Sequence, residues 1–92
     1  MSTLDKDAIN TALAELSGWE HQDDRLRRSF SFEDFQAAIA FINRVAALAE
    51  AANHHPELHN VYADVSIELT SHDAGGVTDR DIALARAISD AA

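Results

Sequence analysis

The stretch that decides the fold runs from Asn60 to Thr70 and reads NVYADVSIELT. Its apolar and polar residues alternate, which is the period of a β-strand. One strand of eleven residues would extend about 36 Å, roughly twice the usual length of a strand. We therefore weigh one long strand against a hairpin that turns at Ala63-Asp64, and the length argument favours the hairpin.

This hairpin also makes a prediction about the histidines of the chain. Pairing around a turn at residues 63–64 places His59 opposite Glu68 and His55 opposite His72. Two histidines that are distant in the sequence would then meet at one end of a sheet.

Three segments of helical period surround the stretch. The first has Asp5 as its expected N-cap, the second covers about residues 32–52 with Ser31 as its N-cap, and the third begins at Thr78 with Asp81 three residues later. Between the first two, strands at 19–21 and 25–30 flank a turn at 22–24. The order predicts a single α+β domain over residues 1–92, arranged α-β-β-α-β-β-α, with a four-stranded antiparallel sheet and its helices packed on one face.

The second helix carries more apolar surface than one sheet easily covers. Its predicted core stripe consists of Ala38, Ile39, Ile42, Val45, Ala46 and Ala49. Phe41 and Leu48 are offset from that stripe, so we expect a second apolar face and a homodimer or homotetramer formed through this helix or the sheet edge. A single wide core face is the alternative.

Composition limits the classes of function. The 92 residues contain 16 Asp and Glu against 7 Lys and Arg, which gives a net charge of −9. Nucleic acids and anionic lipid surfaces attract clustered cations, so we expect neither as a partner. The chain has no cysteine, and we see no apolar run near the length of about 18 residues that a membrane span needs. We predict a cytoplasmic protein.

Four of the five histidines lie between His54 and His72. The proline at 56 disfavours helical geometry at His55, so the second helix must end here and run into a strand. Imidazoles exchange protons near neutral pH, and converging histidines suit acid-base catalysis. The competing interpretation is that His54, His55 and Pro56 form only a polar helix end.

A metal site is the third interpretation of these histidines. Zinc accepts three neutral imidazoles and a water molecule, and His54, His55 and His72 would be the ligands. No HExxH pattern accompanies them. We therefore predict no metal.

Several segments of the chain resemble the pterin-4a-carbinolamine dehydratase family. The resemblance rests on the segments EAANHHPELHNVY (residues 50–62), LTSH (69–72) and TDRD (78–81), and on Gly18-Trp19. It covers nearly the whole chain. It implies dehydration of 4a-hydroxytetrahydropterin to quinonoid dihydropterin in tetrahydrobiopterin recycling, without a metal or organic cofactor.

The resemblance also implies roles for single residues. His54 and His72 would act as acid and base, and His55 would bind and orient the pterin. Glu50 could orient an imidazole or accept hydrogen bonds from the pterin, although a solvated helix residue is the alternative. Asn53 and Leu58 stand where better-known members carry an aspartate and often an aromatic residue.

Other residues are candidates for substrate contact with simpler alternatives. We include Asn53, Pro56, Trp19, Arg80 and Asp81 in the binding site. Trp19 could instead fill the core, Arg80 could be a surface cation, and Asp81 is most simply the partner of a capping box. The alternative function for the whole chain is a dehydratase-like binding or assembly module without catalysis.

Overall fold

The computed structural model describes residues 2–92. Its helices and strands follow the predicted order, with these bounds: α1 Lys6–Leu13, β1 Glu20–Gln22, β2 Arg25–Ser31, α2 Phe35–Ala52, β3 Glu57–Val61, β4 Asp64–Leu69 and α3 Asp79–Ala91. The strands form one antiparallel sheet in the order β1-β2-β4-β3. The predicted α+β architecture is confirmed.

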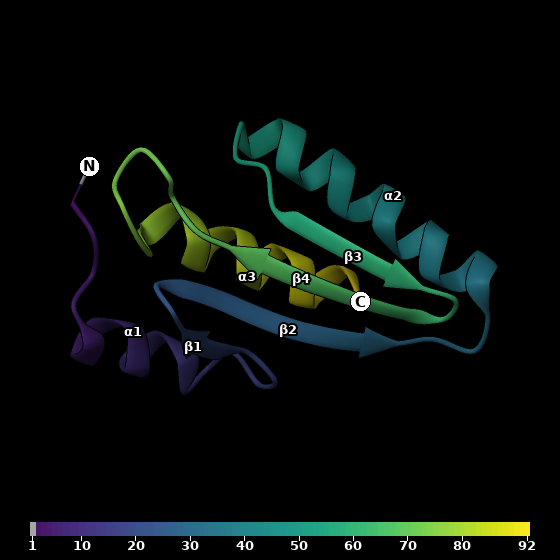
Figure 1. The fold of residues 1–92 in the computed structure, drawn as a ribbon, viewed down its shortest axis with the longest axis horizontal. Helices are drawn as coiled ribbons and strands as arrows, with labels where there is room; N and C mark the ends of the chain where they lie inside the picture. The colour runs from purple at the N-terminus through teal and green to yellow at the C-terminus, as the bar shows by residue number, and fades with distance from the viewer. Residues whose placement is uncertain (1) are drawn as a thin grey trace.

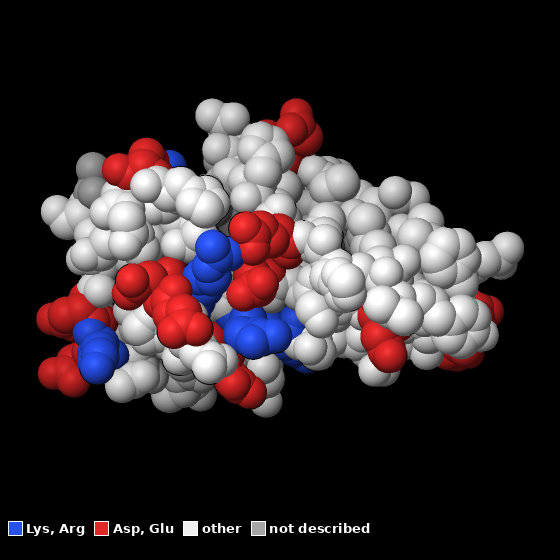
Figure 2. Space-filling view, viewed as in Figure 1, with Lys and Arg blue, Asp and Glu red and all other residues white. Residues whose placement is uncertain are grey.

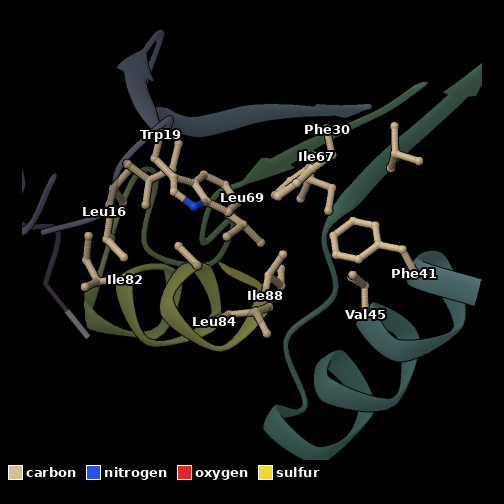
Figure 3. Packing of buried hydrophobic residues seen from close by; sticks show 14 of the residues in the cluster. Leu16, Trp19, Phe30, Phe41, Val45, Ile67, Leu69, Ile82, Leu84 and Ile88 are labelled. Carbon is tan, nitrogen blue, oxygen red and sulfur yellow. The ribbon is translucent and has the colours of Figure 1, made fainter. Parts of the chain in front are cut away.

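The helices lie on one side of the sheet (Figure 1). Along β2, buried Leu26 and Phe30 alternate with outward-facing residues, and along β4 buried Val65, Ile67 and Leu69 do the same. Figure 3 shows Phe30, Ile67 and Leu69 on the side of the sheet that faces α2 and α3. The sheet therefore has one covered face and one open face, as one-sided alternation predicts.

The hairpin of β3 and β4 turns one residue earlier than predicted. Val61 pairs with Asp64, which leaves Tyr62 and Ala63 as the turn, and His59 lies opposite Ser66 rather than Glu68. Tyr62 has a φ of 51°, and the Asn60 side chain donates hydrogen bonds to the main-chain oxygens of Tyr62 and Asp64. An asparagine side chain that binds the backbone nearby favours such a turn, and alternation alone could not locate it.

The first hairpin forms where it was predicted, but Gln22, expected in the turn, is the last residue of β1, and Trp19 precedes the strand. Asp23 and Asp24 both have positive φ, the type I′ pattern of a two-residue hairpin turn. The caps of α1 and α3 are as predicted. The Asp5 side chain caps α1 by accepting a hydrogen bond from the Ala8 N–H. Thr78 and Asp81 form the capping box of α3.

The start and the buried face of α2 differ from the prediction. Asp34 is the N-cap, not Ser31, because β2 continues through Ser31. The buried residues are Ala38, Phe41, Val45 and Ala49. Phe41 is fully buried against Phe30 and Phe32, so it belongs to the core stripe and not to a second face.

Helix α2 is also more apolar than the sequence prediction allowed. Its 18 residues have a mean hydropathy of 1.2, which meets the length and composition of a membrane span, although 22% of them are buried inside the domain. Among residues 2–92 it is the one helix that does so. Here it packs against β4 and α3 as a core helix with a largely uncovered outer side.

Candidate functional site

A cleft of about 320 Å³ lies at one end of the sheet, next to the start of β3 and the end of β4. It is lined by residues from two segments: Asn53, His54 and His55 after α2, and Thr70, His72 and Asp73 after β4. The predicted meeting of the histidines at one end of the sheet therefore occurs, even though the hairpin register differs.

The end of α2 separates the two adjacent histidines. Asn53 adopts the left-handed conformation, with a φ of 49°, and its N–H closes the last turn of the helix. Asparagine tolerates this conformation better than most residues other than glycine. The reversal leaves His54 buried, with 8% of its surface exposed, while the His55 side chain remains 58% exposed.

His54 is held by a buried carboxylate. Its Nε2 lies 2.5 Å from Oδ1 of Asp81, which has no exposed surface. The second oxygen of Asp81 accepts hydrogen bonds from the Ser71 hydroxyl at 2.8 Å and from the Thr78 N–H at 2.9 Å. Asp81 is thus both the capping-box residue and the partner of a candidate catalytic histidine. Three donors offset the cost of burying its charge.

Glu50 orients the other adjacent histidine. Its Oε1 lies 2.6 Å from His55 Nε2. The Glu50 side chain is 78% exposed, so this pair is weakly stabilising but still restricts the imidazole. This contact supports the predicted role of Glu50 in orienting an imidazole.

His72 lies on a short loop between β4 and α3. Ser71 and Gly76 close the loop through the hydrogen bond from Ser71 N to Gly76 O, and Gly75 supplies a φ of 83° that favours glycine. Beside it, Arg80 Nη2 donates to Asp73 Oδ1 at 2.6 Å. The hydrogen bond from Arg80 lowers the pKa of the Asp73 carboxyl below its ordinary value.

Arg80 and Trp19 lie away from the cleft lining. Arg80 lines a neighbouring, mainly apolar pocket of about 330 Å³ between α2 and α3, which His54 also borders. Trp19 lies in the core, where it is 5% exposed (Figure 3). Its Nε1 donates a hydrogen bond to Ser89 Oγ at 2.7 Å. Trp19 therefore fills the core, which was the alternative to substrate contact. Pro56, another predicted binding residue, does not line the cleft either.

Charges around the fold are mixed in sign. On the face shown in Figure 2, Lys and Arg side chains lie among Asp and Glu. Arg25 of β2 and Glu57 of β3 form an ion pair, although β4 lies between these two strands. Within residues 2–92, moreover, no group of three or more His, Asp and Glu side chains has the geometry to hold a metal ion.

The role of Ser71 and the contact between Asp81 and His54 were not predicted from the sequence. Ser71 continues the inward alternation of Val65, Ile67 and Leu69, and it is 1% exposed. A serine at an inward position must find a hydrogen-bond partner. That position was the available signal, whereas the partner, Asp81, depends on how α3 docks.

Comparison with known proteins assigns the chain to a family. Residues 2–91 match the family described as pterin 4 alpha carbinolamine dehydratase. The chain belongs to this family.

Relatives with known names agree. A protein of Thermomicrobium roseum, provisionally named pterin-4-alpha-carbinolamine dehydratase, is 50% identical over 92 residues, covering 100% of this chain and 99% of its own. A protein of Prochlorococcus marinus with the same provisional name is 51% identical over 86 residues, covering 94% of this chain and 90% of its own.

Solved structures extend the comparison to the fold. The crystal structure of a transcriptional coactivator/pterin dehydratase from Brucella melitensis superimposes with a TM-score of 0.95 at 39% identity, and covers 99% of both chains. A pterin dehydratase-like protein described as a RuBisCO assembly factor of the alpha-carboxysome has a TM-score of 0.65 at 23% identity, covering 79% of this chain and 84% of its own. The second likeness concerns the fold alone.

Proposed function

We propose that this protein dehydrates 4a-hydroxytetrahydropterin to quinonoid dihydropterin by histidine acid-base catalysis, as a step in tetrahydrobiopterin recycling. The observation that carries the proposal is the cleft in which His54, His55 and His72 meet. Membership of the dehydratase family supports the choice of a pterin as substrate.

The reaction needs two proton transfers on one molecule. The bond between C4a and the hydroxyl oxygen breaks, and the oxygen leaves as water after it receives a proton. The adjacent ring nitrogen loses its proton, and the electron pair of that N–H bond forms the new C=N double bond. His54 and His72, which line the same cleft from two segments, are the proposed acid and base. His55, oriented by Glu50, would bind the pterin.

A dehydratase assay on histidine variants tests this proposal. We expect His54→Ala and His72→Ala each to lower turnover by about 10²- to 10⁴-fold, the usual contribution of a positioned acid or base. His59→Ala is the matched control, because His59 is an exposed histidine on β3 outside the cleft lining. Circular dichroism checks that each variant is folded. Unchanged turnover in a variant that combines His54→Ala and His72→Ala would contradict the acid-base assignment.

The same assay separates catalysis from a binding or assembly role. A purified protein that does not accelerate dehydration above the spontaneous rate, yet captures a specific partner, would favour a non-catalytic module. The fold is compatible with such a role, because the assembly factor described above shares it.

We also propose that the protein self-associates through α2. Only four of its 18 residues are buried in the domain, and its only charged residues are Arg44 and Glu50. Ile39 is half-buried and Ala46 exposed on the flank of the core stripe. A second copy of this apolar helix would cover that flank. Sedimentation equilibrium should show a dimer or tetramer that Ala46→Glu dissociates, whereas the control Ala8→Glu on α1 should not. A monomeric wild-type chain would overturn the proposal.

A further inference from the structure

The two candidate catalytic histidines are linked through one buried residue. Ser71 closes the loop that carries His72 through its main chain, since its N–H donates to Gly76 O and its carbonyl accepts from the N–H groups of residues 74–76. Its side chain donates to Asp81, which holds His54. Ser71 therefore contacts the supports of both imidazoles.

The hydrogen bonds around Ser71 have a defined direction. A carboxylate only accepts, so Ser71 must give its single hydroxyl proton to Asp81 Oδ2. The Thr78 hydroxyl, 2.8 Å from Ser71 Oγ, must then be the donor of that contact. Thr78 is fully buried and Ser71 is 1% exposed, so water does not compete for these positions. The chain of donors runs from Thr78 to Ser71 to Asp81.

The same logic fixes the proton of His54. Asp81 Oδ1 accepts from His54 Nε2, so Nε2 carries the proton and the neutral ring has an unprotonated Nδ1. Nδ1 has no hydrogen-bond partner among residues 2–92. The single fully buried side-chain nitrogen or oxygen that lacks a partner in this part of the chain is Arg80 Nε. His54 Nδ1 is not among such atoms, so it keeps some exposed surface at which it can accept a proton, although His54 as a whole is only 8% exposed.

We propose that Ser71 is a positioning residue which, with Thr78 and Asp81, holds His54 in the tautomer that accepts a proton at Nδ1. It follows that His54 is the base of the dehydration and that His72 supplies the proton to the departing hydroxyl. This assignment of roles rests on the proposed function, whereas the tautomer does not. A carboxylate that fixes a histidine tautomer in this way is a recognised element of acid-base sites.

The variant Asp81→Asn tests the direction of the chain. The oxygen of the new amide must face Ser71 and the Thr78 N–H, because both are donors. Its NH₂ group then faces His54 Nε2, which must become an acceptor, and the proton moves to Nδ1. We expect long-range ¹H–¹⁵N spectra to show Nε2–H in the wild type and Nδ1–H in Asp81→Asn. Nδ1–H in the wild type, or no change in the variant, would overturn the proposal.

The variant Ser71→Ala tests the positioning role. We expect faster solvent exchange of the His54 Nε2–H and a fall in kcat of about 10- to 100-fold with KM nearly unchanged, as for lost supporting contacts in other sites. Ser66→Ala is the matched control, since the Ser66 hydroxyl contacts the hydroxyl of the exposed Ser29. Equal exchange rates in Ser71→Ala and wild type would contradict the role. If Ser71→Ala does not fold, the wild-type spectrum still decides the tautomer. If no variant or wild type turns over pterin, the spectra still stand and only the proposed function fails.

Discussion

Removal of the Asp81 carboxylate should destabilise the domain far more than removal of its neighbour Asp79. Both are acidic residues of the first turn of α3. Asp81 is fully buried and accepts from three groups, whereas Asp79 is exposed. In Asp81→Ala, the Ser71 hydroxyl and the Thr78 N–H lose an acceptor where water cannot replace it.

The magnitude follows from these contacts. Asp81→Ala leaves three buried donors without their acceptor, at about 1–3 kcal/mol each, while it also removes the cost of burying the carboxylate. The free energy of unfolding of a domain of this size is about 5–14 kcal/mol. We therefore expect Asp81→Ala to lose about 3–5 kcal/mol. Asp79→Ala should lose about 0.3–1 kcal/mol, because only its interaction with the helix dipole is removed.

Urea unfolding followed by circular dichroism measures both losses. Asp81→Asn is the informative intermediate, because its amide oxygen can still accept from Ser71 and Thr78. We expect its free energy of unfolding to lie between those of Asp81→Ala and the wild type. A loss in Asp81→Ala within about 1 kcal/mol of the loss in Asp79→Ala would refute the reasoning, since it would mean that water replaces the carboxylate at no cost.

Three further predictions concern residues around the site and the core. Arg80→Gln should raise the Asp73 pKa toward its ordinary value of 3.8, measured by NMR titration. Because the pKa is lowered in the folded state, the Asp73 carboxylate stabilises the fold above pH 3.8, and this contribution is lost as the pH falls through the folded-state pKa. An unchanged Asp73 titration in Arg80→Gln would exclude the Arg80 contact in solution. Trp19→Phe should lower the free energy of unfolding by about 1–3 kcal/mol, because the hydrogen bond to Ser89 and part of the side-chain volume are lost. KM for the pterin should stay unchanged, and a large rise in KM would instead place the indole at the substrate. Asn60→Ala should cost about 1 kcal/mol in urea unfolding, because two main-chain acceptors of the turn lose their donor, and an unaffected stability would mean that the backbone alone sets the turn.

The sequence predicted those features that depend on neighbouring residues. Asp5 and Thr78 were located as caps because a cap binds N–H groups two or three residues away. The turn at Tyr62-Ala63 was displaced by one residue, because it depends on a side-chain bond from Asn60 that alternation does not report. The face of α2 was misjudged at Phe41 because several apolar residues of the helix could form a stripe, and only docking on the sheet selects one.

The candidate site shows the same division between local and tertiary information. His54 and His55 could be found from their position before Pro56, and the predicted hairpin connected them with His72. The support of His54 could not be found in this way, because Asp81 is 27 residues distant and already has a sufficient local role as a capping residue. The Asp81 carboxylate thus caps the N-terminus of α3 and also binds the His54 imidazole at the cleft. Because the cap fixes where Asp81 stands and α3 is held against the sheet by its buried residues, folding of the last helix itself brings the partner of His54 into place. The site is therefore assembled by the same contacts that stabilise the domain, and variants that weaken the start of α3 should impair both together.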